Sequence, residues 1–379
     1  MTASVTDAAG NLSTDTSTDE LIIDITAPVA PAVEPLITSN NTPVLSGTTS
    51  IAPGESLVVT VDAVTYTEGD GNLVVNSDGT WDLTIPAANV IADGTYAVTA
   101  TITDLAGNTT NDTATDELIV DTTAPVVPTV VSQTTSNTTP VISGAATLAP
   151  GETLSVEVDG VTYTAGDGNL TDNGDGTWDL TIPTALADNT YPVTVTVIDS
   201  AGNSSVDITN SELIIDTVLP AIPTVASLIT FNTTPVISGT ATVAPGETLS
   251  VTVNGVTYTA GDGNLIDNGD GSWDLSIPAA LIEDTYAVTA NVTDAAGNSS
   301  DDISIDELVV DITSPVTPTV ISLITNNTTP VISGTTSTAA GEQLNVEVNG
   351  VTYVAGDGNL VVNGDGTCLL YTSPSPRDS

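Results

Sequence analysis

Residues 139–144 read Thr-Pro-Val-Ile-Ser-Gly, and this phrase returns along the chain at a nearly constant interval. Its proline stands at Pro43, Pro140, Pro235 and Pro330, in steps of 97, 95 and 95 residues. Four other phrases keep the same period: Gly-Asp-Gly-Asn, Trp-Asp-Leu, Asp-x-Ala-Gly-Asn, and a linker in which Pro follows Asp by four residues. A period of about 95 residues is too long for a solenoid coil and has the size of one small domain. The sequence therefore predicts a tandem array of domains.

Each repeat is built from short alternating runs of apolar and polar residues. Leu154, Val156 and Val158 alternate with polar residues, and the same pattern returns at 178–182 and 193–197. Alternation with a period of two predicts a strand with one buried face. No stretch has helical spacing. About seven short antiparallel strands in 95 residues predict an all-β fold of tandem immunoglobulin-like β-sandwich domains, arranged as an extended rod.

The turns and aromatic residues refine this prediction. Asp159-Gly160 separates two strands and is typical of a hairpin turn. We expect the remaining strands before Pro140, from Pro140, from Trp178, from Tyr191 and at 212–216. Trp178 is expected in the core. Tyr191, with Tyr96 and Tyr286 at the same place in the other repeats, stands where a tyrosine corner lies, although packing over the rim of the core is an alternative.

The period also divides the chain. We expect the C-terminal piece of a truncated repeat at 1–24, complete repeats at 25–121, 122–216 and 217–311, and a truncated fourth repeat at 312–367. Met1 aligns with Val98, inside a strand, and Cys368 stands where the period predicts Trp. Residues 368–379 resemble a translated sequencing adapter and are expected to be a non-native tail. The native protein is therefore expected to extend in both directions.

Charge excludes several classes of partner. The chain has 48 Asp plus Glu, one Lys or Arg and no His. The single basic residue is Arg377 in the suspect tail, so residues 1–367 contain no base. Phosphate recognition needs Lys or Arg, so nucleic acid and anionic lipid are not expected partners. The only cysteine is Cys368, which leaves no disulfide and no ligand set for zinc, haem or iron–sulfur clusters. No apolar run reaches the roughly 18 residues of a membrane span.

Acidic residues are the side chains of the repeats that could bind a ligand. The topology of the predicted sandwich indicates which of them lie close together. In a sandwich of this type, Glu152, Asp199 and the pair Asp167 and Asp175 lie in three loops at the pole where the domain begins. Asp121 enters that pole from the linker. Carboxylates that converge without a basic partner are costly unless a cation joins them. Oxygen ligands without His or Cys favour a hard cation, and Ca²⁺ tolerates irregular geometry better than Mg²⁺.

We therefore predict calcium at the junctions between repeats. Each of the first three junctions supplies a linker acid, the glutamate of the Ala-Pro-Gly-Glu loop and the aspartate of Asp-x-Ala-Gly-Asn, and the fourth supplies only the linker acid and the glutamate. The predicted ligands are Asp24, Glu55, Asp104, Asp121, Glu152, Asp199, Asp216, Glu247, Asp294, Asp311 and Glu342. Asp172-Asn-Gly-Asp-Gly-Thr looks like the start of an EF-hand loop, but Ile182 occupies the place of the closing Glu. A turn is the expected structure there.

The repeats resemble the bacterial Ig-like domains of large secreted adhesins, including calcium-dependent RTX-type adhesins. The phrases that carry the resemblance are Thr-Pro-Val-Ile-Ser-Gly, Ala-Pro-Gly-Glu, Asn-Gly-Val-Thr-Tyr, Asp-Ala-Ala-Gly-Asn and the Asp-x-x-x-Pro linker. The resemblance covers essentially all of 1–367. It implies an extracellular stalk on the bacterial surface, calcium at domain junctions, and a ligand that is bound through domains outside this chain. The Gly-Gly-x-Gly-x-Asp run of an RTX β-roll is absent.

Three functions follow from these observations. The first is a structural extender of an adhesin that supports cell adhesion or biofilm formation, with neighbouring repeats as its partners. The second is a set of carbohydrate- or protein-binding modules, and the third is a spacer in a secreted multidomain enzyme. Aromatic residues make up 3% of the chain, which disfavours stacking platforms for sugars. Paired carboxylates could hydrolyse glycosides, but the same acids return in every repeat, so no enzymatic activity is expected.

Overall fold

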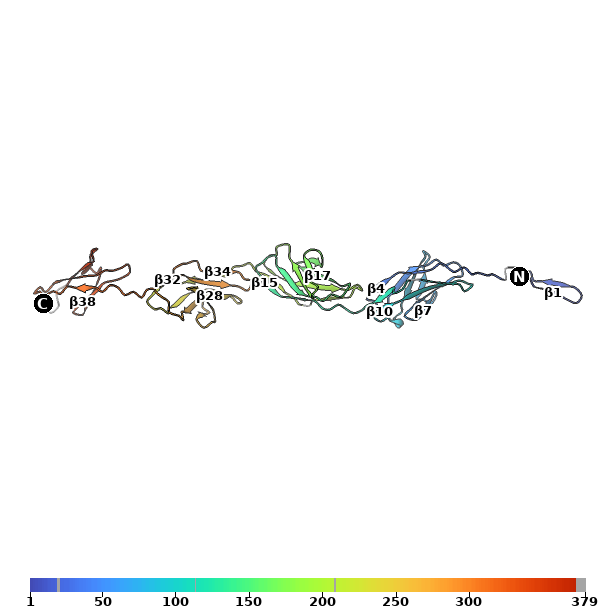
Figure 1. The fold of residues 1–379 in the computed structure, drawn as a ribbon, viewed down its shortest axis with the longest axis horizontal. Helices are drawn as coiled ribbons and strands as arrows, with labels where there is room; N and C mark the ends of the chain where they lie inside the picture. Colours follow the sequence, from blue (N-terminus) through green and yellow to red (C-terminus); the bar gives the residue numbers. More distant parts are fainter. Residues whose placement is uncertain (19–20, 113, 208, 373–379) are drawn as a thin grey trace. The chain divides into compact units, whose positions relative to one another are not determined.

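The computed structural model describes residues 1–18, 21–112, 114–207 and 209–372. The described residues contain β-strands and one 3₁₀ turn, η1 (Ala87–Asn89), and no α-helix. The chain divides into two compact units, one made of residues 1–218 with 295–297 and the other of residues 219–294 with 298–379. Figure 1 shows the strands of each repeat coloured along the chain. Within the described residues no helix is long and apolar enough to cross a membrane.

The second repeat shows the architecture best. Its strands are β14 (Thr129–Val130), β15 (Gln133–Thr135), β16 (Val141–Ala145), β17 (Thr153–Val158), β18 (Val161–Thr164), β19 (Leu170–Asp172), β20 (Thr177–Thr181), β21 (Asn189–Tyr191), β22 (Val193–Ile198), β23 (Ser204–Val206) and β24 (Leu213–Ile215). They form three sheets, in the orders β14-β16-β20-β19, β18-β17-β22-β23 and β15-β24-β21. All pairs are antiparallel except β15 with β24, which is parallel.

The first and third repeats have the same strand order. The first contains β3 (Ala32–Val33), β4 (Leu36–Thr38), β5 (Val44–Thr48), β6 (Ser56–Val61), β7 (Val64–Thr67), β8 (Leu73–Val75), β9 (Thr80–Thr84), β10 (Gly94–Tyr96), β11 (Val98–Thr103), β12 (Thr109–Asn111) and β13 (Leu118–Val120). The third contains β25 (Thr224–Val225), β26 (Leu228–Thr230), β27 (Val236–Thr240), β28 (Thr248–Val253), β29 (Val256–Thr259), β30 (Leu265–Asp267), β31 (Ser272–Ser276), β32 (Asp284–Tyr286), β33 (Val288–Thr293), β34 (Ser299–Asp301) and β35 (Leu308–Val310).

The two ends of the chain carry partial repeats. At the start lies a hairpin of β1 (Ser4–Thr6) and β2 (Leu12–Thr14). The fourth repeat contains β36 (Thr319–Val320), β37 (Val331–Thr335), β38 (Asn345–Val348), β39 (Val351–Val354), β40 (Leu360–Val362) and β41 (Thr367–Tyr371). Part of the expected tail thus forms β41, with Cys368 opposite Gly334 as Trp178 is opposite Gly144. Residues 373–379 of that tail lie outside the described residues.

The core of each complete repeat lies between its sheets, as the alternation predicts. In β17 the side chains of Leu154, Val156 and Val158 are buried, and the polar residues between them are not. Trp178 is completely buried and packs on Gly144 of the neighbouring strand: a Cβ at position 144 would lie 2.6 Å from the indole ring. The prediction of an all-β fold of tandem sandwich domains is confirmed. The arrangement as an extended rod stays a prediction.

The number of strands differs from the sequence prediction. The described residues of each complete repeat form eleven short strands, where about seven were expected. The region before Pro140 divides into β14 and β15, the region from Tyr191 divides into β21 and β22, and β19 and β23 were not foreseen. Strands of two or three residues are too short to display a recognisable alternation, because the period-two pattern needs about four residues to be visible.

Candidate functional site

The junction between the first and second repeats lies within the first unit and brings three predicted ligands together. Asp121, Glu152 and Asp199 line one pocket with a volume of about 210 Å³, and Ile37 and Ile119 supply part of its apolar wall. The linker after β13 positions Asp121, the loop before β17 positions Glu152, and the loop after β22 positions Asp199. Residues more than 75 positions apart in the sequence therefore meet at the place that the sandwich topology predicts.

Each of these carboxylates is oriented by hydrogen bonds from nearby residues. Glu152 accepts a hydrogen bond on Oε2 from the backbone N–H of Ala149 at 2.8 Å. Asp199 accepts the backbone N–H groups of Ala201 and Asn203 on Oδ1, each at 2.9 Å. Asp121 accepts the N–H of Thr123 on Oδ1 at 3.0 Å. Because an ionised carboxylate offers about four acceptor positions, each group retains capacity for a further ligand.

The pKa of Asp199 reflects its surroundings. Burial acts to raise the pKa of this carboxyl, but hydrogen bonds from the side chain and backbone of Asn203, and from Ala201 and Gly202, together hold it below its usual value. Asp104 is the equivalent residue of the first repeat, and the Asn108 side chain is the main group that lowers its pKa. Both aspartates are therefore ionised at neutral pH and available to a cation.

The other candidate acids are placed less favourably. Asp167 and Asp175 do not line the pocket, because their carboxylates cap their own turns. Asp167 accepts the backbone N–H groups of Asn169 and Leu170, and Asp175 accepts both the N–H and the hydroxyl of Thr177. Asp172 likewise accepts the N–H of Gly174, so the sequence that looks like the start of an EF-hand loop forms a turn.

The equivalent acids of the other junctions have the same local environments. Glu55, Glu247 and Glu342 each accept a backbone N–H three residues upstream, at 2.7–2.8 Å. Asp24 and Asp311 each accept the N–H two residues downstream, at 2.9 Å. Asp294 accepts the Asn298 side chain at 2.8 Å, and Asp216 accepts the N–H of Val218 at 3.0 Å. The local sequence therefore presents these carboxylates in the same way in each repeat.

The pocket does not form a closed metal site. Among the residues that the structure describes, no group of three His, Cys, Asp or Glu side chains is close enough to hold a metal ion. The donor chemistry nevertheless suits calcium, since the pocket supplies three carboxylates and residues 1–367 contain no Lys or Arg to neutralise them. A cation here would have to draw the carboxylates closer together than they now lie.

The structure adds a set of direct hydrogen bonds that we did not predict from the sequence. The backbone N–H of Asp121 donates to the carbonyl of Thr38 in the first repeat at 3.0 Å. The carbonyl of the same residue accepts the side-chain amide of Asn203 in the second repeat at 2.7 Å. The N–H of Ser39 also donates to the carbonyl of Ala201 at 3.1 Å. The backbone of Asp121 therefore connects the two repeats without any metal.

Further contacts fix the linker that follows this residue. Asp93 of the first repeat accepts hydrogen bonds from the hydroxyls of Thr122 and Thr123 at 2.8 Å, and these contacts lower its pKa. Downstream, the hydroxyl of Ser205 donates to the carbonyl of Pro125 at 2.6 Å. Asn203 was visible in the Asp-x-Ala-Gly-Asn phrase, whereas nothing in the sequence distinguishes Asp93 and Ser205 from other polar surface residues.

The same contacts return elsewhere in the chain. Asn108 donates to the carbonyl of Asp24 at 3.1 Å, and Thr110 donates to the carbonyl of Pro28 at 2.8 Å. In the third repeat the hydroxyl of Ser300 donates to the carbonyl of Pro220 at 2.8 Å. Each complete repeat therefore holds the linker that precedes it, and the repetition includes the connection as well as the domain.

The tyrosine corner is confirmed in all three complete repeats. The phenolic hydroxyls of Tyr96, Tyr191 and Tyr286 donate to the backbone carbonyl four residues upstream, at 2.9, 2.9 and 3.1 Å. This contact is the one by which a tyrosine corner is defined. The tyrosine therefore has a structural role in each of these repeats.

These repeats match the family model of the bacterial Ig-like domain at residues 34–122, 129–217 and 225–312. The matches cover more than half of the chain, which therefore belongs to the bacterial Ig-like domain family. No curated protein matches the chain.

Two solved structures illustrate what the chain is similar to. One is a tetra-tandem repeat in the extending region of a large adhesion protein, with 26% identity, 92% coverage of each chain and a TM-score of 0.31. Another is an I-band fragment of titin, with 11% identity, coverage of 75% of this chain and 96% of that chain, and a TM-score of 0.37. The family assignment depends on the family model and not on these two likenesses.

Proposed function

We propose that this chain is part of the structural extender of a bacterial surface adhesin, and that calcium stiffens the junctions between its repeats. The extender role is supported by the way in which the linker is built. Asp121 is bonded to both neighbouring repeats, and Asn108 and Asn203 hold their linkers in the same way. A spacer needs the same linker contacts at every junction, because its length is the number of domains multiplied by the distance between neighbouring domains.

The role of a binding module receives less support from the aromatic residues. Carbohydrate sites stack sugars on exposed aromatic rings, but Trp81, Trp178 and Trp273 are completely buried. Tyr66, Tyr163 and Tyr258 are also buried, at 4–9% exposure. These tryptophan and tyrosine side chains, which recur in the three complete repeats, are therefore part of the hydrophobic cores. The sites of adhesion would lie on other parts of the protein.

Calcium is proposed on the basis of charge and chemistry. Asp121, Glu152 and Asp199 share a pocket in a region that has no basic residue. Closely placed carboxylates repel one another, and a divalent cation relieves the repulsion while oxygen ligands bind it. Calcium at about 100 times its dissociation constant would add roughly 2.7 kcal/mol to the stability of the folded state.

The test is thermal melting and small-angle scattering of the full chain with calcium and with a chelator. We expect calcium to raise the melting temperature and the maximum dimension. Asp121→Asn should reduce both effects, since it removes a carboxylate from the pocket while keeping the side-chain oxygen that accepts Thr123. Asp175→Asn is the matched control, because it removes the same charge outside the pocket. Equal behaviour of the two variants would contradict the ligand assignment.

Sodium chloride separates a specific site from general screening. Monovalent salt weakens charge repulsion beyond about 8–10 Å at physiological ionic strength, and should stabilise the calcium-free chain in part. It supplies no bridge between carboxylates, so it should not reproduce the scattering profile that calcium gives. An identical profile with sodium chloride alone would contradict the proposal of calcium-stiffened junctions and leave the extender role standing.

A further inference from the structure

Each complete repeat buries one glutamate, which begins a recurring phrase of Glu, Leu, two β-branched residues and Asp. These glutamates are Glu117, Glu212 and Glu307, and they are 2–3% exposed. The phrase contains β13, β24 and β35, the strands that lead to the linker acids. A glutamate is almost never fully buried unless it is paired, and residues 1–367 contain no Lys or Arg. The contacts of these side chains therefore need a physical explanation.

The partner of each glutamate lies where the chain passes from one sheet to another. In the second repeat, Tyr191 of β21 pairs with Leu213 of β24. Val193 of β22 pairs with Val158 of β17, which belongs to a different sheet. The chain therefore changes sheets within two residues, at Pro192. Proline has no N–H to donate to a ladder and suits a position where the pairing is interrupted.

The glutamate side chain supplies the hydrogen-bond acceptor at this crossing. Oε2 of Glu212 accepts the backbone N–H of Val193 at 3.1 Å. A buried N–H that lacks an acceptor is unfavourable, so the carboxylate takes the place of a neighbouring strand. The same contact returns in the first and third repeats, where Glu117 accepts the N–H of Val98 at 3.1 Å and Glu307 that of Val288 at 3.0 Å.

The backbone of the same glutamate contacts a third strand. The carbonyl of Glu212 accepts the N–H of Gln133, the first residue of β15, at 2.6 Å. One residue is thereby connected to β15, β22 and β24, which belong to two different sheets. The equivalent carbonyls are those of Glu117, which accepts Leu36 at 2.7 Å, and Glu307, which accepts Leu228 at 2.6 Å.

The turn before each glutamate is strained in the same way. Asp116, Ser211 and Asp306 have φ angles of 63°, 68° and 59°, in the left-handed region. This conformation is uncommon for residues other than glycine, and it persists only where surrounding contacts hold it. The two hydrogen bonds of the following glutamate are present in all three repeats and supply such contacts.

The second oxygen of each carboxylate adds to the cost of burial. Oε1 of Glu117, Glu212 and Glu307 is buried and has no hydrogen-bond partner among the described residues. A buried polar atom of this kind is unfavourable. An aliphatic side chain would avoid that cost, but it could not accept the N–H at the crossing.

We propose that Glu117, Glu212 and Glu307 are positioning residues that staple two sheets of each repeat together where the chain crosses between them. In the second repeat, the staple joins the sheet of β15, β24 and β21 to the sheet that contains β22. It fixes the start of β24, and the same sheet ends at Asp216, whose N–H donates to the carbonyl of Thr135 at 3.1 Å. The backbone that continues into the linker is therefore held from inside the domain, and this role does not depend on calcium.

The test compares two replacements of similar size in the full chain. Glu212→Gln keeps a side-chain oxygen that can accept the N–H of Val193, so the crossing should stay closed. Glu212→Leu fills the same space without an acceptor, and amide hydrogen exchange in β21 and β24 should become about tenfold faster or more. Mass spectrometry of peptides from each repeat measures the exchange, with the first and third repeats as internal references.

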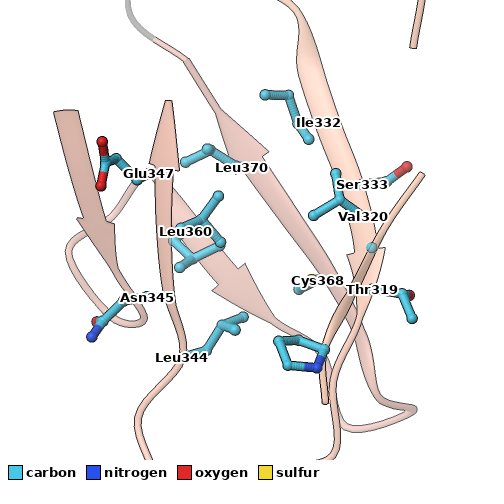
Figure 2. A pocket seen from close by; sticks show the side chains of 13 residues that line it. Thr319, Val320, Ile332, Ser333, Leu344, Asn345, Glu347, Leu360, Cys368 and Leu370 are labelled. Carbon is cyan, nitrogen blue, oxygen red and sulfur yellow. The ribbon is translucent and has the colours of Figure 1, made fainter. Parts of the chain in front are cut away.

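Glu157→Leu is the matched control. Glu157 lies in the same repeat and is exposed on β17. Figure 2 shows its counterpart in the fourth repeat, Glu347, turned away from the buried side chains of Leu360 and Leu370. Replacement of Glu157 should therefore leave the exchange of β21 and β24 unchanged.

The two replacements of Glu212 separate an acceptor from a space-filling group. If Glu212→Leu were protected as well as the unchanged chain, or if the Leu and Gln variants behaved alike, the staple would be overturned. A second repeat that folds with Gln and does not fold with Leu would support it, because the acceptor is the main difference between the two side chains. Loss of folding in both variants would overturn the role of the acceptor.

Discussion

The side-chain amide of Asn203 lies 2.7 Å from the backbone carbonyl of Asp121 and 2.8 Å from the Oδ2 carboxylate oxygen of Asp199. One side chain therefore fixes both the linker that enters the second repeat and an acid that lines the junction pocket. The first and last residues of the Asp-x-Ala-Gly-Asn phrase, which recurs at this place, act together. The aspartate caps the turn, and the asparagine holds the aspartate and the linker together.

Asn203→Ala should loosen the junction between the first two repeats. The variant loses two side-chain hydrogen bonds, at a cost of about 1–3 kcal/mol. Asn173→Ala is a matched control, because Asn173 also donates two side-chain hydrogen bonds, to Thr177 and Asp179, away from the linker. Amide hydrogen exchange should speed up at Asp121 in the Asn203 variant alone. Equal exchange in both variants would show that the linker does not depend on this side chain.

Gly144→Ala should destabilise the second repeat through its core. A Cβ there would lie 2.0 Å from the carbonyl oxygen of Thr129 and 2.6 Å from the ring of Trp178, and neither neighbour can move freely. Overpacking of this kind costs about 1–3 kcal/mol or more. The measurement is thermal melting followed by circular dichroism. Gly364→Ala, where nothing lies within 4 Å of the added Cβ, should leave the melting unchanged.

Tyr191→Phe tests the tyrosine corner. The variant keeps the ring in place and removes the hydroxyl that donates to the carbonyl of Ala187. The free energy of unfolding of the second repeat should fall by about 0.5–1.5 kcal/mol, the usual net contribution of one hydrogen bond. Chemical denaturation resolves a change of this size. A variant as stable as the unchanged chain would show that the hydroxyl is satisfied equally well by water.

Acid should destabilise the repeats below about pH 4. Backbone hydrogen bonds from Leu170 and Asn169 hold the pKa of Asp167 below its usual value, and equivalent contacts do the same for Asp262 and Asp357. An aspartate whose pKa is lowered by folding stabilises the folded state above the unfolded value of about 3.9. That contribution is lost as the pH falls through the lower, folded value.

Thermal melting between pH 6 and pH 3 measures this effect. The melting temperature should be nearly constant down to about pH 4 and should fall below it. Asp167→Asn should make the fall in its own repeat smaller, since the amide cannot take up the proton. The same fall in the variant and in the unchanged chain would remove Asp167 from the explanation.

The sequence predicted the main strands because they are long enough to alternate. Leu154, Val156 and Val158 occupy one face of β17 and are all buried, so the period of two was sufficient to place them. Strand β23 (Ser204–Val206) was missed because three residues, two of them serine, carry no visible pattern. The tyrosine corner was identifiable because Tyr191 stands at a fixed place relative to the following strand.

The candidate site was predictable in part. Topology alone placed Asp121, Glu152 and Asp199 at one pole, and they do line one pocket. The hydrogen bonds of the linker could not be foreseen, because they depend on the path of the backbone at Pro125 and Asp121. Glu212 is 2% exposed and accepts the N–H of Val193 at 3.1 Å, although an acid is ordinarily found at the surface. Its burial follows from the local path into β24, which composition does not reveal.

The parallel pairing of β15 with β24 has a mechanical consequence. Gln133 lies near the beginning of the second repeat and is paired with Leu213 near its end, and the two strands run in the same direction. When tension acts through the two linkers, it pulls β15 toward one end and β24 toward the other, along their own axes. The hydrogen bonds between them then bear the load together instead of opening one after another, as they would in a hairpin that is peeled from its tip. Each complete repeat that has this pairing is therefore arranged to resist shear along the line of pull.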